Sequence, residues 1–424
     1  MRIAIISSSF PEDAVADATG VQRRFRQFVE AMKTLAELDV LFFVKPHVDR
    51  DPPSVAATRR RLSNAWDTAL SLRLCAQRAY VAPTSRFRRY LTPAFRLSDL
   101  PPYAQTADKP QVDAVRALLD TKPDLVFVHH LSAMIPFLLS GSRHARVLFD
   151  LSDTDHLAFA RQVDEPPHWR GKPLLRLRLP MIRHWERKAI RRSERTFVTS
   201  EVDRAYLAHT FKAGNVTVVP NATEIPSPGA LTNQPVLLFL GAMRYWPNAA
   251  AAGHLVQNIW PHIRAARPDA RLLIAGQHPE RIALFGTPTP GVEYLGFVDD
   301  LAALYDRVAV VCSPILSGGG TRIKIVEAAA YGKPVVSTTI GAEGLEMEDG
   351  RHLLLRDDPV EFARACVELL NDPAAAQRLG GAARTFVAER YARPAVVENI
   401  RRTLREVVDG RNPGEPTERV DRAS

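Results

Sequence analysis

Residues 313–337 read SPILSGGGTRIKIVEAAAYGKPVVS, and this stretch decides how the second half of the chain is interpreted. The end of an apolar strand is followed by three glycines, a helical segment at 321–331, a glycine and a new apolar run at 334–337. Glycines let the backbone approach a ligand closely because no Cβ intervenes. Free N–H groups and the dipole at a helix start attract anions. The stretch therefore predicts an anion-binding loop at the carboxyl end of a strand.

Side chains around the loop indicate which anion it binds. Thr321 is expected to cap the helix, and Arg322 and Lys324 add positive charge at its first turn. Glu327 follows Lys324 by three residues and shares its side of the helix. Cations next to a carboxylate suit a nucleoside diphosphate, with the cations on the phosphates and the carboxylate on the ribose hydroxyls. A flexible glycine turn, Gly318–Gly320, with surface charges is the alternative.

Strands and helices alternate on both sides of this stretch. Strands are expected at 2–7, 38–44, 124–129, 146–151, 195–199, 216–219, 236–240, 271–275, 292–295, 309–313 and 334–337. Helical patterns lie between them, so each series predicts a parallel sheet covered by helices on both faces. Two such series imply two doubly wound α/β domains with the ligand site in the cleft between them.

The domain boundary is expected in a linker at 211–234, because 221–234 is rich in Pro, Ser, Thr, Asn and Gly. This divides the chain into an N-terminal domain at 1–210 and a C-terminal domain at 235–393. Residues 410–424 are polar and charged and are expected to be disordered.

The composition indicates a folded protein in a reducing compartment. The chain has 424 residues, of which 46% are hydrophobic and 24% charged, as in globular proteins. Its three cysteines are far apart in the sequence, which argues against disulfides and against a zinc site. No apolar run reaches the roughly 18 residues of a membrane span, and the first residues lack a signal-peptide core. We therefore expect a cytoplasmic protein that binds no metal.

Basic residues are concentrated in two stretches, 51–102 and 170–195, and the net charge of the chain is +9. Leu, Trp and Ile interleave with these charges. The stretches are either solvated helix faces or a surface for an anionic membrane or anionic acceptor, which would place the protein at the inner face of the membrane. No nucleic-acid-binding motif accompanies them, so nucleic acid is not an expected partner.

Four segments of the second half resemble the C-terminal domain of the group-one, family-four glycosyltransferases of the GT-B fold. They read FLGAMRYWPN (239–248), LLIAG (272–276), VEYLGFVDDL (292–301) and EAAAYGKPVV (327–336). The first half matches more loosely. The resemblance implies two Rossmann-like domains and a C-terminal helix, at about 394–408, that packs back on the N-terminal domain.

The resemblance also implies a function. A nucleotide-sugar donor would bind mainly to the C-terminal domain, and a hexosyltransferase-like reaction would proceed with retention, without a metal and without a cofactor other than the donor. The acceptor would be a polysaccharide, a lipid-linked molecule or another glycan. Two other functions stay open, namely a sugar-nucleotide epimerase and a non-catalytic nucleotide-sugar-binding or scaffold protein.

Individual residues carry the resemblance in the C-terminal domain. Glu327 matches the second Glu of the family's motif of two Glu separated by seven residues, but the first position holds Gly319. The N–H groups of Gly319 and Gly320 can substitute for it. Arg244 matches the Arg of an Arg–Lys pair, and no Lys follows within a dozen residues, so Lys324 and its neighbouring cation are expected to supply that charge.

Further residues come from adjacent matching segments. Phe297 and Val298, in the segment 292–301, are assigned to nucleotide binding. Gly20 either brings the N-terminal backbone close to the donor phosphate or the acceptor, or forms an ordinary turn.

The family places a His near the reacting sugar, after an N-terminal strand. At that position this chain has Ser152, followed by Asp153. The candidates for the catalytic group are Asp150, Asp153, Asp155 and His156, and we select Asp153. For each of the three acids, helix capping or solvation of a strand end is the alternative role. His129 and His130 end another strand, where a structural role is favoured over a place in the cleft.

Overall fold

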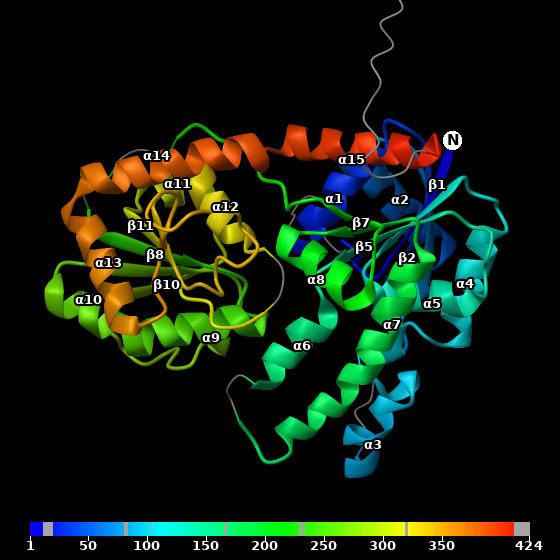
Figure 1. Ribbon diagram of the computed structural model, residues 1–424, viewed down its shortest axis with the longest axis horizontal. Helices are drawn as coiled ribbons and strands as arrows, with labels where there is room; N and C mark the ends of the chain where they lie inside the picture. Colours follow the sequence, from blue (N-terminus) through cyan, green and yellow to red (C-terminus); the bar gives the residue numbers. More distant parts are fainter. Residues whose placement is uncertain are drawn as a thin grey trace, which may run out of the picture.

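The computed structural model describes residues 1–11, 20–79, 84–101, 103–164, 168–228, 232, 234–318 and 321–410. The chain forms two domains side by side, each built on a parallel sheet (Figure 1). The first sheet has seven strands in the order β3-β2-β1-β4-β5-β6-β7, and the second has six in the order β10-β9-β8-β11-β12-β13. The expected doubly wound α/β architecture is confirmed.

The N-terminal domain contains the elements up to β7. Its strands are β1 (Arg2–Ser7), β2 (Glu37–Val44), β3 (Leu70–Ala76), β4 (Leu125–His129), β5 (Val147–Ser152), β6 (Arg195–Val198) and β7 (Val216–Val218). Its α-helices are α1 (Gly20–Met32), α2 (Pro52–Trp66), α3 (Arg86–Tyr90), α4 (Lys109–Leu119), α5 (Leu131–Ser140), α6 (Asp155–Asp164), α7 (Leu179–Arg192) and α8 (Glu201–Phe211). Short 3-10 turns are η1 (Thr92–Ala94), η2 (Leu97–Asp99), η3 (Tyr103–Gln105) and η4 (Lys172–Arg178).

The C-terminal domain begins with β8. Its strands are β8 (Val236–Leu240), β9 (Arg271–Ala275), β10 (Val292–Gly296), β11 (Val310–Ser313), β12 (Val335–Ser337) and β13 (Leu354–Leu355). Its helices are α9 (Trp246–His254), a π-helical turn η5 (Leu255–Ile259), α10 (Trp260–Ala266), a 3-10 turn η6 (Pro279–Arg281), α11 (Leu301–Asp306), α12 (Ile323–Ala330), α13 (Pro359–Asn371) and α14 (Pro373–Arg390). One more helix, α15 (Arg393–Val408), ends the described chain.

Both sheets are buried on both faces, which explains their continuous apolar strands. In β1, Ile3 and Ile5 belong to one hydrophobic core, whereas Ala4 and Ile6 belong to another on the opposite face. This division follows from the alternation of side chains along a strand. Strand β8 is divided between two cores in the same way.

Strand β3 was not expected, because it lies in the basic stretch 51–102. It pairs with β2 at the edge of the first sheet, where Arg73 forms an ion pair of 3.4 Å with Asp39. An edge strand keeps one side open to water, so it accommodates an arginine that a central strand would exclude. The two-residue strand β13 was also missed, because it is too short to show a pattern.

Helix α15 leaves the C-terminal domain and packs on α1 of the first domain (Figure 1). Its buried side chains Val396, Val397, Ile400, Leu404 and Val407 belong to the same core as β1. The chain therefore crosses between the domains twice, after β7 and after α14. At the crossings Thr223 N–H donates to the Tyr391 carbonyl and Arg393 N–H donates to the Thr223 carbonyl, both at 2.9 Å.

None of the described helices combines the length and the apolar content that crossing a bilayer requires.

Candidate functional site

Two helix starts meet where the domains face each other. Helix α1 begins at Gly20 and α12 begins at Ile323. A Cβ placed on Gly20 would lie 3.7 Å from Ile323 Cγ2, so the backbone of α1 comes close to α12. Each helix start is the positive end of a helix dipole, so both favour an anion at this point.

Thr321 does not cap α12, so the expected capping role is wrong. The helix begins two residues later, with Arg322 at the N-cap position and no capping bond from its side chain. Thr321 Oγ1 instead accepts a hydrogen bond of 3.0 Å from Asn221 Nδ2. Thr321 therefore connects the glycine loop to the crossing between the domains.

Gly318 permits close packing at the start of this loop. Its φ is +108°, and a Cβ there would lie 2.8 Å from the Tyr245 hydroxyl and 3.2 Å from Arg322 Nη2. The buried guanidinium of Arg322 donates to the Ser317 carbonyl at 3.2 Å and so stays folded over the loop. The adjacent Gly319 and Gly320 lie outside the described residues.

Lys324 is buried at the carboxyl end of β8. Its Nζ donates to Asn248 Oδ1 at 2.7 Å and lies 4.5 Å from the centre of the Phe239 ring. Burial, followed by the nearby charge of Arg322, lowers the pKa of Lys324 to about 7. Asn248 was not among the expected site residues, although it ends the matching segment 239–248.

Glu327 faces the first domain, one turn deeper along α12. It is 7% exposed, and Oε2 lies 3.0 Å from Arg23 Nη1 of α1. Sequence reasoning missed Arg23, although it follows Gly20 by three residues and so shares its side of the helix. The carboxylate assigned to the ribose is thus held by a cation from the opposite domain.

Asp153 follows β5, after Ser152 with its positive φ of +64°. Burial raises the pKa of the Asp153 carboxyl to about 6, and the positive charge of Arg322 opposes this shift. Asp153 of the first domain and Arg322 of the second therefore interact electrostatically.

The other buried candidates near Asp153 have structural partners. Asp150 is fully buried and accepts hydrogen bonds from Arg24 Nε and Nη2, with its Oδ1 2.6 Å from Nη2. His129 is fully buried behind the strand end, 3.0 Å from Ser7 Oγ. His156 contacts Glu186 through Nδ1 and the Tyr206 hydroxyl, at 2.8 Å, through Nε2. These groups hold the strand ends and helix α6 in place.

A cavity of about 510 Å³ lies between the domains. It is lined by Pro101, Tyr103, His130, Leu131, Ser132, Asp155, Ala158, Phe159, Gln162 and Ile182 of the first domain and by Arg244, Tyr245, Trp246, Pro247, Ser317 and Gly318 of the second. The exposed Arg244 adds a positive charge, with Nη2 3.2 Å from His278 Nε2. The cavity therefore adjoins the glycine loop and receives groups from both domains.

His130 lies in this cavity, contrary to the structural role that the sequence favoured. Its backbone has a strained φ of +69°, and no described group forms a hydrogen bond with its buried Nε2. Burial lowers the pKa of His130 to about 4, so the ring is neutral near neutral pH. A neutral ring adds no charge to the cavity wall.

Asp155 lies close by and accepts a hydrogen bond of 2.6 Å from the Tyr103 hydroxyl. Burial, with the charge of Glu186, raises the pKa of Asp155 to about 8. Its carboxyl is therefore largely protonated at neutral pH, and it presents a polar but uncharged group to the cavity.

Phe297 and Val298 do not line this cavity. They follow β10, which is three strand positions from β11 in the sheet, or about 14 Å at the usual strand spacing. Phe297 is 53% exposed, whereas Val298 packs against the domain core. Only Phe297 is thus available to a ligand that extends from the glycine loop along the strand ends.

Comparisons with known proteins agree with this geometry. A family model described as glycosyl transferases group 1 matches residues 234–372, and one described as glycosyltransferase family 4 matches residues 19–225. The chain is 29% identical over 240 residues to a phosphatidyl-myo-inositol mannosyltransferase of Mycobacterium leprae, a match that covers 54% of this chain and 62% of the relative. The matches span about half the length of the curated relatives, 44% and 62%.

Solved structures share the fold. Sucrose-phosphate synthase from Thermosynechococcus elongatus superposes with a TM-score of 0.69 at 20% identity, covering 96% of this chain and 99% of that one. Anabaena HepE in complex with UDP superposes with a TM-score of 0.63 at 15% identity, covering 96% of this chain and all of the other, 100%. A HepE structure with UDP-glucose agrees equally well, with a TM-score of 0.63.

Proposed function

Because the chain belongs to the glycosyltransferases of group 1 and family 4, which have the GT-B fold, we propose that it transfers a hexose from a nucleoside diphosphate sugar to a glycan or lipid-linked acceptor. The observation that carries the proposal is the meeting of Arg322, Lys324 and Glu327 at the start of α12, opposite the start of α1. Two buried cations and a carboxylate at converging helix starts match the charges of a nucleoside diphosphate.

The donor occupies the carboxyl edge of the second sheet. Its diphosphate lies at the glycine loop beside Arg322 and Lys324, and its ribose hydroxyls donate to Glu327. The exposed ring of Phe297 lies on the way to the base. UDP-glucose is the first donor to test, because HepE of the same fold was solved with it.

The acceptor enters the cavity between the domains. There the side chains of His130 and Asp155 line the space for its hydroxyl groups, next to the loop that holds the transferred sugar. As the bond between the sugar and the phosphate breaks, negative charge grows on the diphosphate. Arg322 and Lys324 stabilise this charge without a metal ion, and Asp153 faces the sugar from the first domain. The reaction retains the configuration at the anomeric carbon.

The test is a donor screen followed by product analysis. Thermal shifts with UDP-, GDP-, ADP- and dTDP-sugars identify the nucleotide, since binding at a hundredfold excess over Kd adds about 2.7 kcal/mol of stability. Transfer to added glycans or lipid-linked sugars supports the proposal. Conversion of the donor to its epimer, or binding without any turnover, would replace it with an epimerase or with a binding protein.

Metal independence has its own test. Activity is expected to persist in EDTA, because the two cations supply the charge that a divalent ion would supply. Complete loss of activity that Mg²⁺ or Mn²⁺ restores would assign the protein to another catalytic class.

A further inference from the structure

A small lobe projects from the first domain. We define the lobe as residues 84–101 and 168–178, which include α3, η1, η2 and η4, and it lies at the lower end of α7 (Figure 1). Its two segments are far apart in sequence but are joined by a 2.9 Å hydrogen bond from Arg178 Nη2 to the Arg89 carbonyl. The Tyr90 hydroxyl also packs against Gly171, 3.5 Å from where a Cβ would lie.

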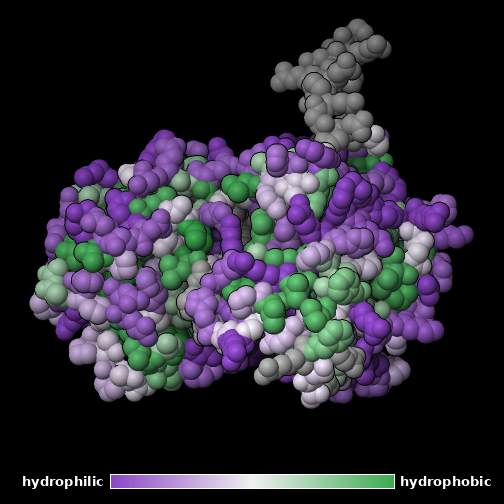
Figure 2. Space-filling model, turned by 60° about the horizontal axis from the view of Figure 1, so that its bottom comes forward, coloured by the Kyte–Doolittle hydropathy of each residue, from purple (hydrophilic) through white to green (hydrophobic). Residues whose placement is uncertain are grey.

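Large apolar side chains of the lobe face water. Phe95 is 81% exposed and Phe87 is 62% exposed. The other exposed apolar residues of the lobe are Leu91, Trp169, Leu174 and Leu177. Figure 2, with this underside turned forward, shows pale and green side chains beside purple ones at its lower right. Large apolar side chains that are exposed together on one lobe, next to polar groups, indicate an interaction surface.

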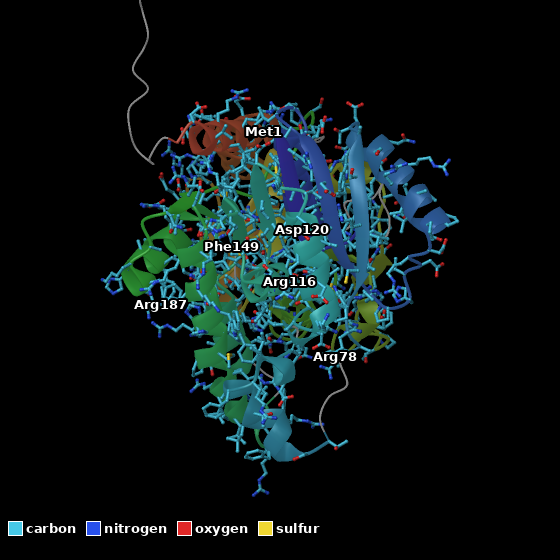
Figure 3. The ribbon with its side chains drawn as sticks, turned by 90° about the vertical axis from the view of Figure 1, so that its right-hand side faces the viewer. Met1, Arg78, Arg116, Asp120, Phe149 and Arg187 are labelled. Carbon is cyan, nitrogen blue, oxygen red and sulfur yellow. The ribbon has the colours of Figure 1, made fainter. Side chains whose placement is uncertain are left out.

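The charge around this patch is predominantly positive, although the exposed Asp164 of α6 forms an ion pair with Arg176 of the lobe. In residues 84–101 and 168–192 the acidic side chains are Asp99 and Glu186, and both are buried. Among the described side chains of the same ranges, the exposed basic ones are Arg89, Arg96, Arg170, Arg176, Arg183, Arg187, Lys188 and Arg191. Figure 3 shows Arg187 projecting outward from α7. Exposed aromatic side chains with cations around them suit an anionic lipid surface.

The structure also shows that the two basic stretches of the sequence, 51–102 and 170–195, do not lie wholly on one surface. Helix α2, with Arg59, Arg60 and Arg61, packs on β3 and lies far from α3 (Figure 1). In Figure 3, Arg78 and Arg187 lie on opposite sides of the domain. Only the later part of the first stretch therefore joins the second stretch in one surface.

We infer that the lobe docks on an anionic bilayer and that the acceptor reaches the cavity from that bilayer, as a lipid-linked molecule. Pro101, at the end of the lobe, and Ile182, on the adjoining α7, both line the cavity between the domains. The docked lobe therefore places the bilayer surface next to the acceptor side of the site. The inferred docking depends only on the exposed side chains of the lobe and α7, whereas the inferred class of acceptor rests on the proposed function.

Vesicle sedimentation tests the docking. The protein is expected to bind vesicles of phosphatidylcholine with phosphatidylglycerol, and not vesicles of phosphatidylcholine alone, with binding that weakens as salt rises. The double variant Phe87→Ser/Phe95→Ser should lower the partition coefficient at least tenfold, roughly the effect of exposing one phenylalanine. Arg187→Ala/Lys188→Ala should lower it about 25-fold, at about fivefold for each cation.

Matched variants outside the lobe provide the controls. Phe285→Ser removes an exposed phenylalanine of the C-terminal domain, and Arg59→Ala/Arg60→Ala removes two cations of α2, so neither should change vesicle binding. Equal binding to neutral and anionic vesicles, or equal losses of binding in the control variants, would overturn the inference. So would a wild-type dimer that becomes monomeric only in the Phe87→Ser/Phe95→Ser variant. The dimer would assign the patch to a second copy of the chain.

Activity measurements separate this inference from the proposed function. The lobe variants should hydrolyse UDP-glucose and transfer to a short, water-soluble acceptor at the wild-type rate, but lose transfer to the same acceptor when it is anchored in vesicles. Wild-type protein that binds vesicles without turning over any donor would refute the proposed function and leave the docking intact. Equal loss on the soluble and the anchored acceptor would overturn the lobe's role in acceptor delivery.

Discussion

At the scale of one residue, the surroundings of Lys324 favour the binding of an anion next to it. Among the described residues its ammonium group has one hydrogen-bond partner, Asn248, and it lies near the Phe239 ring and the guanidinium of Arg322. Burial and the like charge together disfavour its charged form. A bound diphosphate reverses both effects, because it supplies negative charge and hydrogen-bond acceptors. Under the proposed function, donor binding would therefore offset the free-energy cost of burying this ammonium group.

Replacing Lys324 by Ala is expected to lower kcat/KM roughly 10²–10³-fold, the effect of losing one contact that strengthens as charge develops. Glu327→Ala should raise KM more than it lowers kcat, because ribose contacts change little along the reaction. Steady-state kinetics on protein with an unchanged Tm checks both. A folded Lys324→Ala enzyme with normal turnover would show that the glycine loop is only a turn.

Donor binding should also take up a proton. The pKa of Lys324 is about 7 in the free protein, so at about pH 8 most molecules carry it neutral. A bound diphosphate favours the ammonium form and raises this pKa, so affinity for UDP should fall as the pH rises above 7. Calorimetry at about pH 8 in buffers of different ionisation enthalpy should report uptake close to one proton. The Lys324→Met variant should abolish it, and uptake that persists there would assign the proton to another group.

Asp155→Asn should stabilise the protein in a pH-dependent way. The folded-state pKa of Asp155, about 8, lies above its unfolded value, so its contribution to stability is complete below about pH 4 and is lost as pH rises to 8. The gain in Tm should therefore be small near pH 4.5 and reach several degrees near pH 8. Thermal melts of both proteins across this range provide the measurement, and a gain independent of pH would contradict the assignment.

At the scale of elements, α14 fixes the far end of the helix that carries the site. Gly332 follows α12 with a φ of +73°, and a Cβ on Gly380 of α14 would lie 2.0 Å from the Gly332 carbonyl oxygen. The neighbouring Gly381 has open space around it. The two helices therefore pack so closely at Gly380 that no side chain fits between them.

These adjacent glycines form a matched pair for mutation. Gly380→Ala should force α14 away from α12 and cost roughly 1–3 kcal/mol, as overpacking does. Gly381→Ala should add about 0.5–1 kcal/mol, because alanine is the better helix former. Denaturant unfolding of both variants measures the difference. Equal stability of the two variants would show that α14 is not clamped at this position.

The sequence predicted the elements whose signal is local and missed the contacts made across the fold. Apolar strands such as β8 were located because both of their faces are buried, whereas β3 was hidden by Arg73, which an edge strand tolerates. Arg23 and Asn248 were missed although each has a sequence signal, a helix side shared with Gly20 and a place in a matching segment, because their partners come from distant segments. The capping role of Thr321 was wrong because α12 begins two residues later and the Thr321 hydroxyl accepts a hydrogen bond from Asn221 in the crossing between the domains.

At the scale of the molecule, two crossings connect the domains and lie against each other. The hydrogen bonds that Thr223 forms with Tyr391 and Arg393 join them into one short hinge. Across the cleft, Arg161 of α6 donates to the Gly318 carbonyl at 3.1 Å and pairs with Glu343. The domains are thus hinged at one edge and held together by ion pairs at the site.

Truncation tests how far the first domain depends on α15. A chain ending at Ala392 should lose the cooperative unfolding of the N-terminal domain, because each large apolar side chain removed from its core costs roughly 2–5 kcal/mol. A chain ending at Gly410 should melt like the full protein. Calorimetry separates the two domain transitions, and a wild-type first transition in the shorter chain would refute this dependence.

The return of α15 also has a consequence for synthesis. Most chains complete their first domain before the next one leaves the ribosome. Here the core around β1 stays open until Val396–Val407 emerge, after the whole second domain. At 5–20 residues per second, the first sheet waits about 10–40 s for its last helix. During that interval the nascent chain exposes to chaperones the apolar side chains of this core that α15 later covers, so they are expected to hold this protein at the ribosome exit longer than one whose first domain folds by itself.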